Sequence, residues 1–298
     1  MTEKYDLIII GAGPSGMTAG IYAARSGMKV AIVSRNIGGT ANSILLLENW
    51  PGFNGSGMEL MKRFYEQLKS YSVEMILENV EDIRKKGKEF IVKTNKKEIS
   101  GKTILLASGT KRRDLKIPGE ERLKGKGVSY CVTCDGFFYK NKTVAVIGGS
   151  DCAAVSALAL ADIAKKVYVF YRGGPLRCEE INSKRLKENK KVEILYDVIP
   201  KEIKGTDKVE SLVLKDGKEI KLDAIFVEIG ALAHTDFANN LKLKLDSENY
   251  IFVDDEMKSS VPGVFAAGDV TNSKTKQVVT AAAQGAIAAK SAYEYMKK

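Results

Sequence analysis

Two cysteines separated by two residues are the strongest candidates for chemistry in this sequence. Cys131 and Cys134 form a C-x-x-C pair, and Asp135 follows directly. The spacing allows a small disulfide ring, and one thiol of such a pair often ionises more readily than a free cysteine. In a cytosolic chain, which we expect here, this pattern indicates redox or metal chemistry rather than a structural staple.

A zinc site and a pair of inert thiols are the alternatives for this motif. A structural zinc site needs four ligands. The chain has one histidine, His234, and its other cysteines, Cys152 and Cys178, are remote from the pair in sequence. We therefore predict a redox pair and no metal site, and we expect no catalytic role for Cys152, Cys178 or His234.

A glycine-rich turn near the start of the chain could bind a dinucleotide. Gly11, Gly13 and Gly16 form the pattern G-x-G-x-x-G between an apolar run and a stretch of small residues. The first glycine makes the tight turn, the second lets the backbone approach a pyrophosphate, and the third lets the helix pack on the strand. An acid commonly binds the ribose at the end of the next strand, but Ser34 and Arg35 stand there, so the fingerprint does not name the dinucleotide.

The same unit occurs twice in the chain. Placing Gly11 on Gly148 without gaps also places Arg35 on Arg172. The second copy predicts a strand, a helix and a strand at residues 143–147, 151–163 and 167–171. Other apolar runs predict strands at residues 88–94, 103–107, 193–196, 209–215 and 224–229, and helices at residues 59–70 and 280–296. The pattern favours an α/β fold with two nucleotide-binding domains.

Composition and charge exclude several classes of protein. The chain has 298 residues, of which 44% are hydrophobic and 28% charged. This is a globular composition, and at roughly 150 residues per domain it predicts about two domains. No apolar run reaches the roughly 20 residues of a membrane span. Lysines account for much of the net charge of +10, and they are interleaved with glutamates along the chain. Because nucleic-acid binding needs basic residues clustered on one face, we expect none here. A basic surface could still steer an acidic partner. The first residues do not resemble a signal peptide, so we expect a cytoplasmic protein.

Several motifs together resemble the low-molecular-weight thioredoxin reductases, in that family's order along essentially the whole chain. They are Gly38-Gly39-Thr40-Ala41, Glu48-Asn49-Trp50-Pro51-Gly52, Ala107-Ser108-Gly109-Thr110, Ile117-Pro118-Gly119-Glu120, the stretch from Tyr130 to Gly136, the stretch from Gly263 to Val270, and Lys276-Gln277-Val278.

The resemblance implies two Rossmann-like domains, of which the FAD domain is discontinuous. Residues 1–114 and 247–298 would form the FAD domain, and residues 115–246 would form an inserted pyridine-nucleotide domain that carries the cysteine pair. The inserted domain would rotate about hinges near Gly119 and Asp246, so that the nicotinamide and the cysteines reach the flavin in turn. Members of the family are typically homodimers.

The resemblance also implies the roles of individual residues. Cys134 would face the flavin, Cys131 would attack the partner disulfide, and Asp135 would protonate the leaving thiolate. Asp269 would bind the ribityl chain, and Gln277 and Val278 would lie beside the isoalloxazine. The whole FAD set would be Gly11, Gly13, Gly16, Ser34, Arg35, Gly38, Gly39, Thr40, Ala41, Asn49, Gly109, Gly268, Asp269, Gln277 and Val278.

The second glycine turn departs from the family pattern. Ser150 follows Gly148 and Gly149 where the family has a third glycine, and Val155-Ser156 replace two glutamates. A side chain at position 150 crowds the place where the backbone approaches a pyrophosphate. Of the family's basic motif for the NADPH 2′-phosphate, Arg172 and Arg177 stay in register, while Tyr171 and Gly173 replace a histidine and an arginine.

We therefore predict an FAD-dependent thioredoxin-disulfide reductase. Electrons would pass from a donor, with NADPH favoured, through FAD to the cysteine pair and on to thioredoxin or a similar small dithiol protein. Reduced ferredoxin or a deazaflavin is the alternative donor. Two other classes stay open: a ferredoxin–NADP reductase-like enzyme without a protein disulfide substrate, and a flavin-binding redox sensor.

Overall fold

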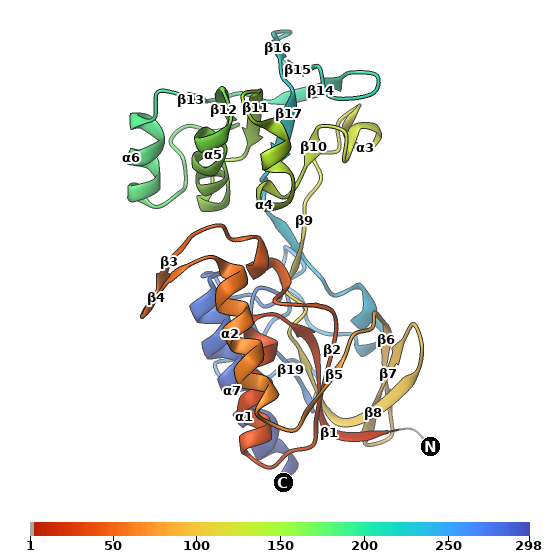
Figure 1. The fold of residues 1–298 in the computed structure, drawn as a ribbon. Helices are drawn as coiled ribbons and strands as arrows, with labels where there is room; N and C mark the ends of the chain where they lie inside the picture. The colour runs from red at the N-terminus through yellow and green to blue at the C-terminus, as the bar shows by residue number, and fades with distance from the viewer. Residues whose placement is uncertain (1–2) are drawn as a thin grey trace. The chain divides into compact units, whose positions relative to one another are not determined.

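The computed structural model describes residues 3–298 and divides them into two compact units (Figure 1). The first unit runs to Lys111 and resumes at Leu232–Lys298, and the second is Arg112–Ala231. The chain passes between them in β9 (Thr110–Arg112) and β18 (Ala231–Ala233), which pair with each other. The predicted fold class, α/β with two Rossmann-like units of which the first is discontinuous, is confirmed.

The described residues of the first unit form a seven-stranded sheet. Its order is β5-β2-β1-β8-β7-β6, and β19 also pairs with β8. The strands are β1 (Lys4–Ala12), β2 (Val30–Ile37), β5 (Val73–Ile76), β6 (Val80–Lys86), β7 (Glu89–Thr94), β8 (Glu98–Leu106) and β19 (Val264–Ala266). The central pairs are parallel, whereas β6, β7 and β8 form an antiparallel meander.

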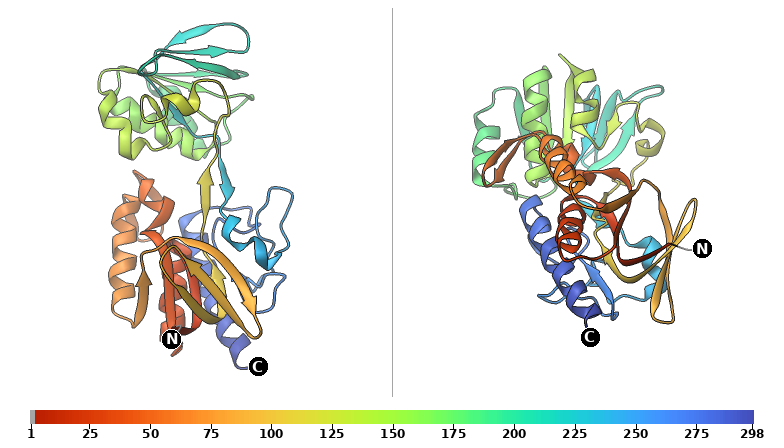
Figure 2. Two further views of the ribbon diagram at one scale, coloured as in Figure 1. Left: turned by 90° about the vertical axis from the view of Figure 1, so that its right-hand side faces the viewer. Right: turned by 60° about the horizontal axis from the view of Figure 1, so that its bottom comes forward.

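The apolar run in β1 is buried on both faces of this sheet. Leu7 and Ile9 pack into one core and Ile8 and Ile10 into the other, and all four are at most 4% exposed. The first core lies under α1 (Pro14–Arg25), α2 (Gly57–Lys69) and α7 (Val278–Met296), which gather on one side of the sheet, with the meander on the other (Figures 1 and 2). A strand covered on both faces needs a continuous apolar sequence, and β1 has one.

Helices α1 and α7 approach each other closely because a glycine lies at their contact. A Cβ built on Gly285 would lie 2.1 Å from the carbonyl oxygen of Ser15. Ala281, Ala288 and Ala292 lie on the buried face of α7. Small side chains therefore let α7 pack against α1, whose N-terminus follows the first glycine turn.

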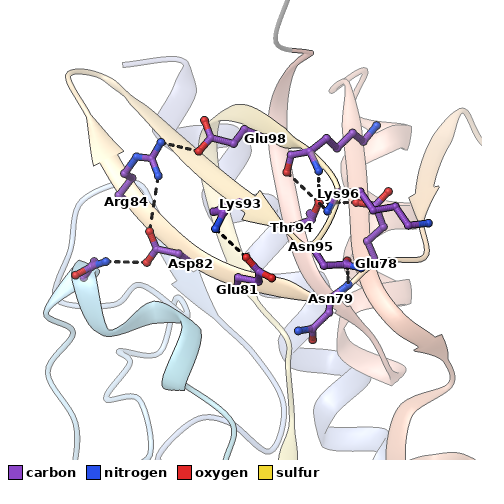
Figure 3. Close-up of polar contacts among 12 residues, drawn as sticks. Glu78, Asn79, Glu81, Asp82, Arg84, Lys93, Thr94, Asn95, Lys96 and Glu98 are labelled. Carbon is purple, nitrogen blue, oxygen red and sulfur yellow. Dashed lines mark hydrogen bonds and ion pairs between the residues drawn. The ribbon is translucent and has the colours of Figure 1, made fainter.

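Ion pairs lie on the surface of the meander, within β6 and between its strands (Figure 3). Arg84 on β6 lies 2.7 Å from Glu98 on β8 and 3.9 Å from Asp82, and Lys93 on β7 lies 2.9 Å from Glu81. Each of these side chains is at least a quarter exposed, so each pair contributes little to stability.

The second boundary between the units lies earlier than the sequence predicted. Residues 232–246 pack with the first unit rather than with the inserted one. Within them η3 (Asp236–Leu241) places Phe237 and Leu241 in the core of the meander side, and Asn240 donates a hydrogen bond to Asp82 at 2.7 Å. The two expected hinge positions lie inside the units, Gly119 in the second and Asp246 in the first.

The second unit repeats the parallel sheet on a smaller scale. Its strands lie in the order β10 (Val128–Ser129), β17 (Ala224–Val227), β11 (Thr143–Ile147), β12 (Lys166–Phe170) and β13 (Val192–Leu195). Its helices are α3 (Glu120–Leu123), α4 (Val132–Asp135), α5 (Asp151–Ile163) and α6 (Glu180–Glu188), with the 3-10 turn η2 (Gly136–Tyr139). A three-stranded antiparallel sheet completes it, with β14 (Pro200–Lys204), β15 (Ser211–Leu214) and β16 (Glu219–Lys221).

Every helix and strand predicted from the sequence has a counterpart in the structure. The strand at 143–147 and the helix at 151–163 have the predicted bounds. The short hairpin of β3 (Leu47–Trp50) and β4 (Phe53–Gly55) and the turn η1 (Gly39–Ser43) were not predicted. Within residues 3–298 no helix combines the length and apolar character needed to cross a membrane.

Candidate active site

The first glycine turn has the shape that a dinucleotide needs. Gly11 has a φ of 111°, and a Cβ there would lie 2.3 Å from the carbonyl oxygen of Ala107, the residue after β8. A Cβ on Gly16 would lie 1.9 Å from the carbonyl oxygen of Gly11. A Cβ on Gly13, in contrast, would meet nothing within 4 Å. The turn is therefore tightly packed at Gly11 and Gly16 and open at Gly13, where a pyrophosphate would approach.

Segments that are distant in sequence gather around this turn. The amide of Gly38 donates to the carbonyl of Ala12 at 2.8 Å, and a Cβ on Gly39 would lie 3.5 Å from the Cα of Gly13. From the other end of the chain, a Cβ on Gly268 would lie 2.7 Å from Ser15 Oγ. These contacts lie at the carboxyl ends of parallel strands, where α/β sheets bind ligands.

Two predicted flavin residues from opposite ends of the first unit contact each other. Asn49 Nδ2 donates to Gln277 Oε1 at 3.2 Å. Gln277 caps α7, where its side chain and that of Thr280 form a reciprocal capping box, and Val278 is the first residue of the helix. Thr40 and Ala41 lie in η1, which packs on α2.

Asp269 presents a carboxylate that lacks a side-chain donor among the residues that the structure describes. None of residues 3–298 donates a hydrogen bond to its carboxyl oxygens, and burial raises the pKa of the carboxyl, with Lys276 offsetting part of the effect. The ammonium of Lys276 instead donates to the carbonyls of Asp269 and Thr271, at 3.0 and 2.6 Å. A half-buried carboxylate that lacks a donor suits the hydroxyls of a polyol such as the ribityl chain.

The remaining predicted flavin residues are more exposed. Ser34 donates to the carbonyl of Asn36 at 2.7 Å, and the side chain of Arg35 is exposed. Gly109 has a φ of 62° and accepts a hydrogen bond from the amide of His234 at 3.1 Å. Burial lowers the pKa of His234, and Arg35 and Lys111 lower it further. The sequence predicted no catalytic role for His234, and its backbone contact with Gly109 is structural.

Cys131 and Cys134 are joined by a disulfide that spans the short helix α4. Their Cα atoms are 5.3 Å apart, Cys134 is exposed and Cys131 is half-buried. Cys131 is the N-cap of α4, and its Sγ accepts the amide hydrogen of Cys134 at 3.2 Å. An amide donor aimed at Cys131 Sγ would stabilise a thiolate on that sulfur once the disulfide is reduced.

Asp135 is held by a serine that the sequence analysis missed. Ser129 Oγ donates to Asp135 Oδ2 at 2.6 Å and accepts the amide hydrogen of Cys131 at 3.1 Å. Burial raises the pKa of the nearby Tyr139, and the charge of Asp135 raises it further. No sequence pattern assigns a role to Ser129. The one signal that could have suggested a role is its position two residues before Cys131.

The residue before the redox pair is also anchored. Tyr130 donates to Glu120 Oε1 at 2.6 Å, and Glu120, only 4% exposed, accepts the amides of Leu115 and Lys116 at 2.8 and 2.6 Å. Burial and the carboxylate of Glu120 raise the pKa of Tyr130. These bonds hold the backbone that leads into Cys131 in place.

The second glycine turn has the backbone of the first but different side chains. Ser150 has φ −91° and ψ 178°, and Gly13 has φ −81° and ψ −170°. The amide of Arg177 donates to the carbonyl of Gly149 at 2.7 Å, as Gly38 does to Ala12 in the first unit. The Cβ and hydroxyl of Ser150 therefore extend from the position that is open at Gly13.

Other side chains at this turn change its charge. Asp151 is the first residue of α5, and its Oδ1 accepts the amide of Glu179 at 2.7 Å and the side chain of Asn182 at 3.2 Å. The two predicted phosphate-binding residues, Arg172 and Arg177, are exposed. A carboxylate in the first turn of α5 competes with a pyrophosphate for the positive end of the helix.

A buried ion pair lies beside the same turn. Glu228 accepts hydrogen bonds from Arg112 and from Ser156, the latter at 3.0 Å, and its side chain is 3% exposed. Burial raises the pKa of Glu228, while Arg112 and Ser156 offset part of the effect. Its carbonyl oxygen would lie 2.2 Å from a Cβ on Gly148. A cluster of three or more His, Cys, Asp and Glu side chains able to hold a metal does not occur in residues 3–298.

Comparison with known proteins assigns the chain to a family. The family model of the pyridine nucleotide-disulphide oxidoreductases matches residues 5–285. The chain belongs to this family. A thioredoxin reductase from Peptoclostridium acidaminophilum is 38% identical to the chain over 311 residues, covering 100% of the chain and 98% of the relative.

Solved structures agree with this assignment. The thioredoxin reductase of Lactococcus lactis in the FR conformation has a TM-score of 0.95 and 38% identity, covering 98% of this chain and 99% of that one. A ferredoxin-flavin thioredoxin reductase from Clostridium acetobutylicum has a TM-score of 0.56 and 32% identity, covering 99% of this chain and 98% of that one. The predicted resemblance to low-molecular-weight thioredoxin reductases is confirmed, and the chain is an oxidoreductase of a family that uses a flavin and a nicotinamide nucleotide.

Proposed function

We propose that the chain reduces a protein disulfide, taking electrons through FAD to Cys131 and Cys134 and from these cysteines to thioredoxin or a similar small protein. The Cys131–Cys134 disulfide carries this proposal. It closes over a four-residue helix, exposes Cys134 and is flanked by an anchored acid, Asp135. Thiol–disulfide exchange needs an accessible sulfur and a proton donor for the leaving thiolate.

The first unit fits FAD as its resident cofactor. The open position at Gly13 suits the pyrophosphate, the unsatisfied carboxylate of Asp269 suits the ribityl hydroxyls, and Asn49 and Gln277 suit the isoalloxazine. Bound FAD supplies two-electron redox chemistry. The protein contributes the cradle and the orientation.

Two exposed aromatic side chains favour a protein substrate over a small molecule. Phe137 and Phe138 are 74% and 77% exposed, and they follow the redox motif directly in the second unit. Adjacent exposed phenyl rings beside a reactive disulfide are typical of a surface that another protein covers. They argue against a ferredoxin–NADP reductase-like enzyme without a protein disulfide substrate. A homodimer and a cytoplasmic location, both following the family pattern, complete the proposal.

The donor is the point at which two candidates compete. Arg172 and Arg177 are exposed and could hold the 2′-phosphate of NADPH, the favoured donor. Ser150 and Asp151 favour the second candidate, reduced ferredoxin or a deazaflavin, because both side chains oppose a pyrophosphate at the second turn. The similarity to a ferredoxin-flavin thioredoxin reductase supports this second candidate.

One experiment tests the proposed function. The purified protein is expected to be yellow, to release FAD rather than FMN, and to reduce oxidised thioredoxin with at least one of NADPH, NADH, reduced ferredoxin or a reduced deazaflavin. A colourless protein that FAD cannot reconstitute would overturn the proposal. An FAD-loaded protein that reduces no protein disulfide with any of the four donors would overturn it as well.

A further inference from the structure

Ser129 occupies the centre of a hydrogen-bond relay at the redox motif. It lies on β10, which pairs with β17, and is 5% exposed. Its hydroxyl accepts the amide hydrogen of Cys131 at 3.1 Å and lies 2.6 Å from Asp135 Oδ2 and 3.4 Å from the carbonyl of Cys131. A hydroxyl has one proton to donate, and the shorter contact to a carboxylate takes it.

The relay makes the two oxygens of Asp135 unequal. Oδ2 accepts from Ser129, whereas Oδ1 has no hydrogen-bond partner among the residues that the structure describes. We propose that Ser129 is a positioning residue for disulfide exchange, which holds Asp135 through Oδ2 so that Oδ1 carries the transferred proton. This inference rests on the proposed function.

The exchange step balances without another reactant. In the mixed disulfide, the sulfur of Cys134 attacks the sulfur of Cys131, having given its proton to Asp135 Oδ1. The Cys131–partner bond breaks, the Cys131–Cys134 bond forms, and the electron pair leaves on the partner's sulfur. That thiolate takes the proton from Oδ1. The enzyme dithiol is oxidised and the partner disulfide is reduced.

Ser129 matters most when the enzyme disulfide is open. The covalent link between Cys131 and Cys134 is then absent, so hydrogen bonds take over its part in holding α4. The amide of Asp135 donates to the carbonyl of Cys131 at 3.1 Å, and the amide of Cys134 donates to Cys131 Sγ. Neither of these bonds involves the carboxylate of Asp135, and within residues 3–298 Ser129 is the residue that donates a hydrogen bond to it.

The test compares two disulfides whose leaving groups differ in their need for a proton. The FAD-loaded enzyme is reduced with dithiothreitol, desalted without oxygen and mixed with 5,5′-dithiobis(2-nitrobenzoate) or with hydroxyethyl disulfide. The aromatic thiolate leaves without a proton, whereas the alkyl thiolate leaves faster when it is protonated. Ser129→Ala is expected to slow the alkyl reaction by about 10-fold, a part of the full general-acid effect, and to slow the aromatic reaction clearly less, because its leaving thiolate needs no proton from Asp135.

Three further variants sharpen the result. Ser129→Thr keeps a hydroxyl and is expected to restore the alkyl reaction. In an Asp135→Asn background, Ser129→Ala is expected to cost nothing further, because both changes remove the same proton transfer. Ser211→Ala is the matched control, since Ser211 is 4% exposed and donates to Glu219 at 2.6 Å in the same unit.

The outcomes separate the inference from the proposed function. Equal slowing of both disulfides by Ser129→Ala, or no slowing of either, overturns the inference. Independent effects of Ser129→Ala and Asp135→Asn overturn it as well. A reduced wild type that reacts with neither disulfide overturns the proposed function itself.

Discussion

Asn49 and Gln277 share a hydrogen bond of 3.2 Å, although 228 positions separate them in the chain. Asn49 lies on β3, and Gln277 caps α7. The bond joins the short hairpin to the N-terminus of the last helix. Both side chains were predicted to line the flavin site, and the fold brings them to one place in the first unit.

The binding of FAD is expected to depend on pH through Asp269. Burial raises the pKa of this carboxyl, so the apo-protein keeps the proton to a higher pH than a free aspartate does. Ribityl hydroxyls would donate to the ionised form, so the affinity for FAD should rise as pH rises through the apo-protein's pKa. Titration of apo-protein with FAD between about pH 4 and pH 8 measures this change. Asp269→Asn should flatten the profile and weaken binding about 10-fold at neutral pH.

Two glycine substitutions should separate FAD binding from stability. Gly13→Ala adds a methyl group where the structure has nothing within 4 Å, so the apo-protein should fold normally while FAD affinity falls at least about 10-fold. Gly285→Ala places its Cβ 2.1 Å from a backbone oxygen of α1 and should lower the free energy of unfolding by about 1–3 kcal/mol. Thermal unfolding of the apo-proteins and FAD titration test both. A Gly13→Ala protein that binds FAD normally would contradict the assignment of this turn.

The four cysteines should divide into two classes. Cys131→Ser and Cys134→Ser should each abolish reduction of a protein disulfide while FAD stays bound, because exchange needs both sulfurs. Cys152→Ser and Cys178→Ser should keep most of the activity. Burial and the nearby Asp151 raise the pKa of Cys178, which makes it a poor nucleophile at neutral pH. An essential Cys178 beside a dispensable Cys131 would refute the assignment.

The donor can be identified from the flavin absorbance. If NADPH is used, Arg172→Ala should raise its KM about 10-fold and affect NADH little, because NADH lacks the 2′-phosphate. Ser150→Gly should improve the use of either nucleotide. Anaerobic addition of NADPH to the wild type is the decisive measurement. Absence of bleaching over minutes at about millimolar NADPH would leave ferredoxin or a deazaflavin as the donor.

The buried pair of Glu228 and Arg112 should make stability depend on pH. The pKa of Glu228 is raised in the folded chain, so its contribution to stability is fully present below the unfolded pKa and is lost as pH rises through the folded value. Urea unfolding across this range should show that loss in the wild type and a flatter profile in Glu228→Gln. Arg112→Ala should cost about 2–3 kcal/mol at neutral pH, because it leaves a buried carboxylate unpaired. If Arg112→Ala lowered the free energy of unfolding less at neutral pH than at acid pH, the assignment of a buried, paired carboxylate to Glu228 would be wrong.

The sequence alone determined the parts of this protein that depend on local pattern. The apolar run before Gly11, the glycine turn and the helix after it identify a nucleotide-binding unit, because each strand and helix is specified by neighbouring residues. The predicted strand and helix of the repeat, residues 143–147 and 151–163, have the same bounds in the structure. The cysteine pair was equally visible, because its chemistry depends on a spacing of three positions.

Only the tertiary structure decided the contacts between distant segments. The placement of residues 232–246 depends on Phe237 and Leu241 finding the core beside β6, which no local pattern indicates. The relay from Cys131 through Ser129 to Asp135 depends on side-chain directions at the end of a two-residue strand, β10, which is too short to show periodicity. The burial of Phe237 and Leu241 arises only when remote parts of the chain are packed together, and the relay, although local in sequence, depends on the path of the backbone from β10 into α4. Neither could be predicted from residue types and spacing.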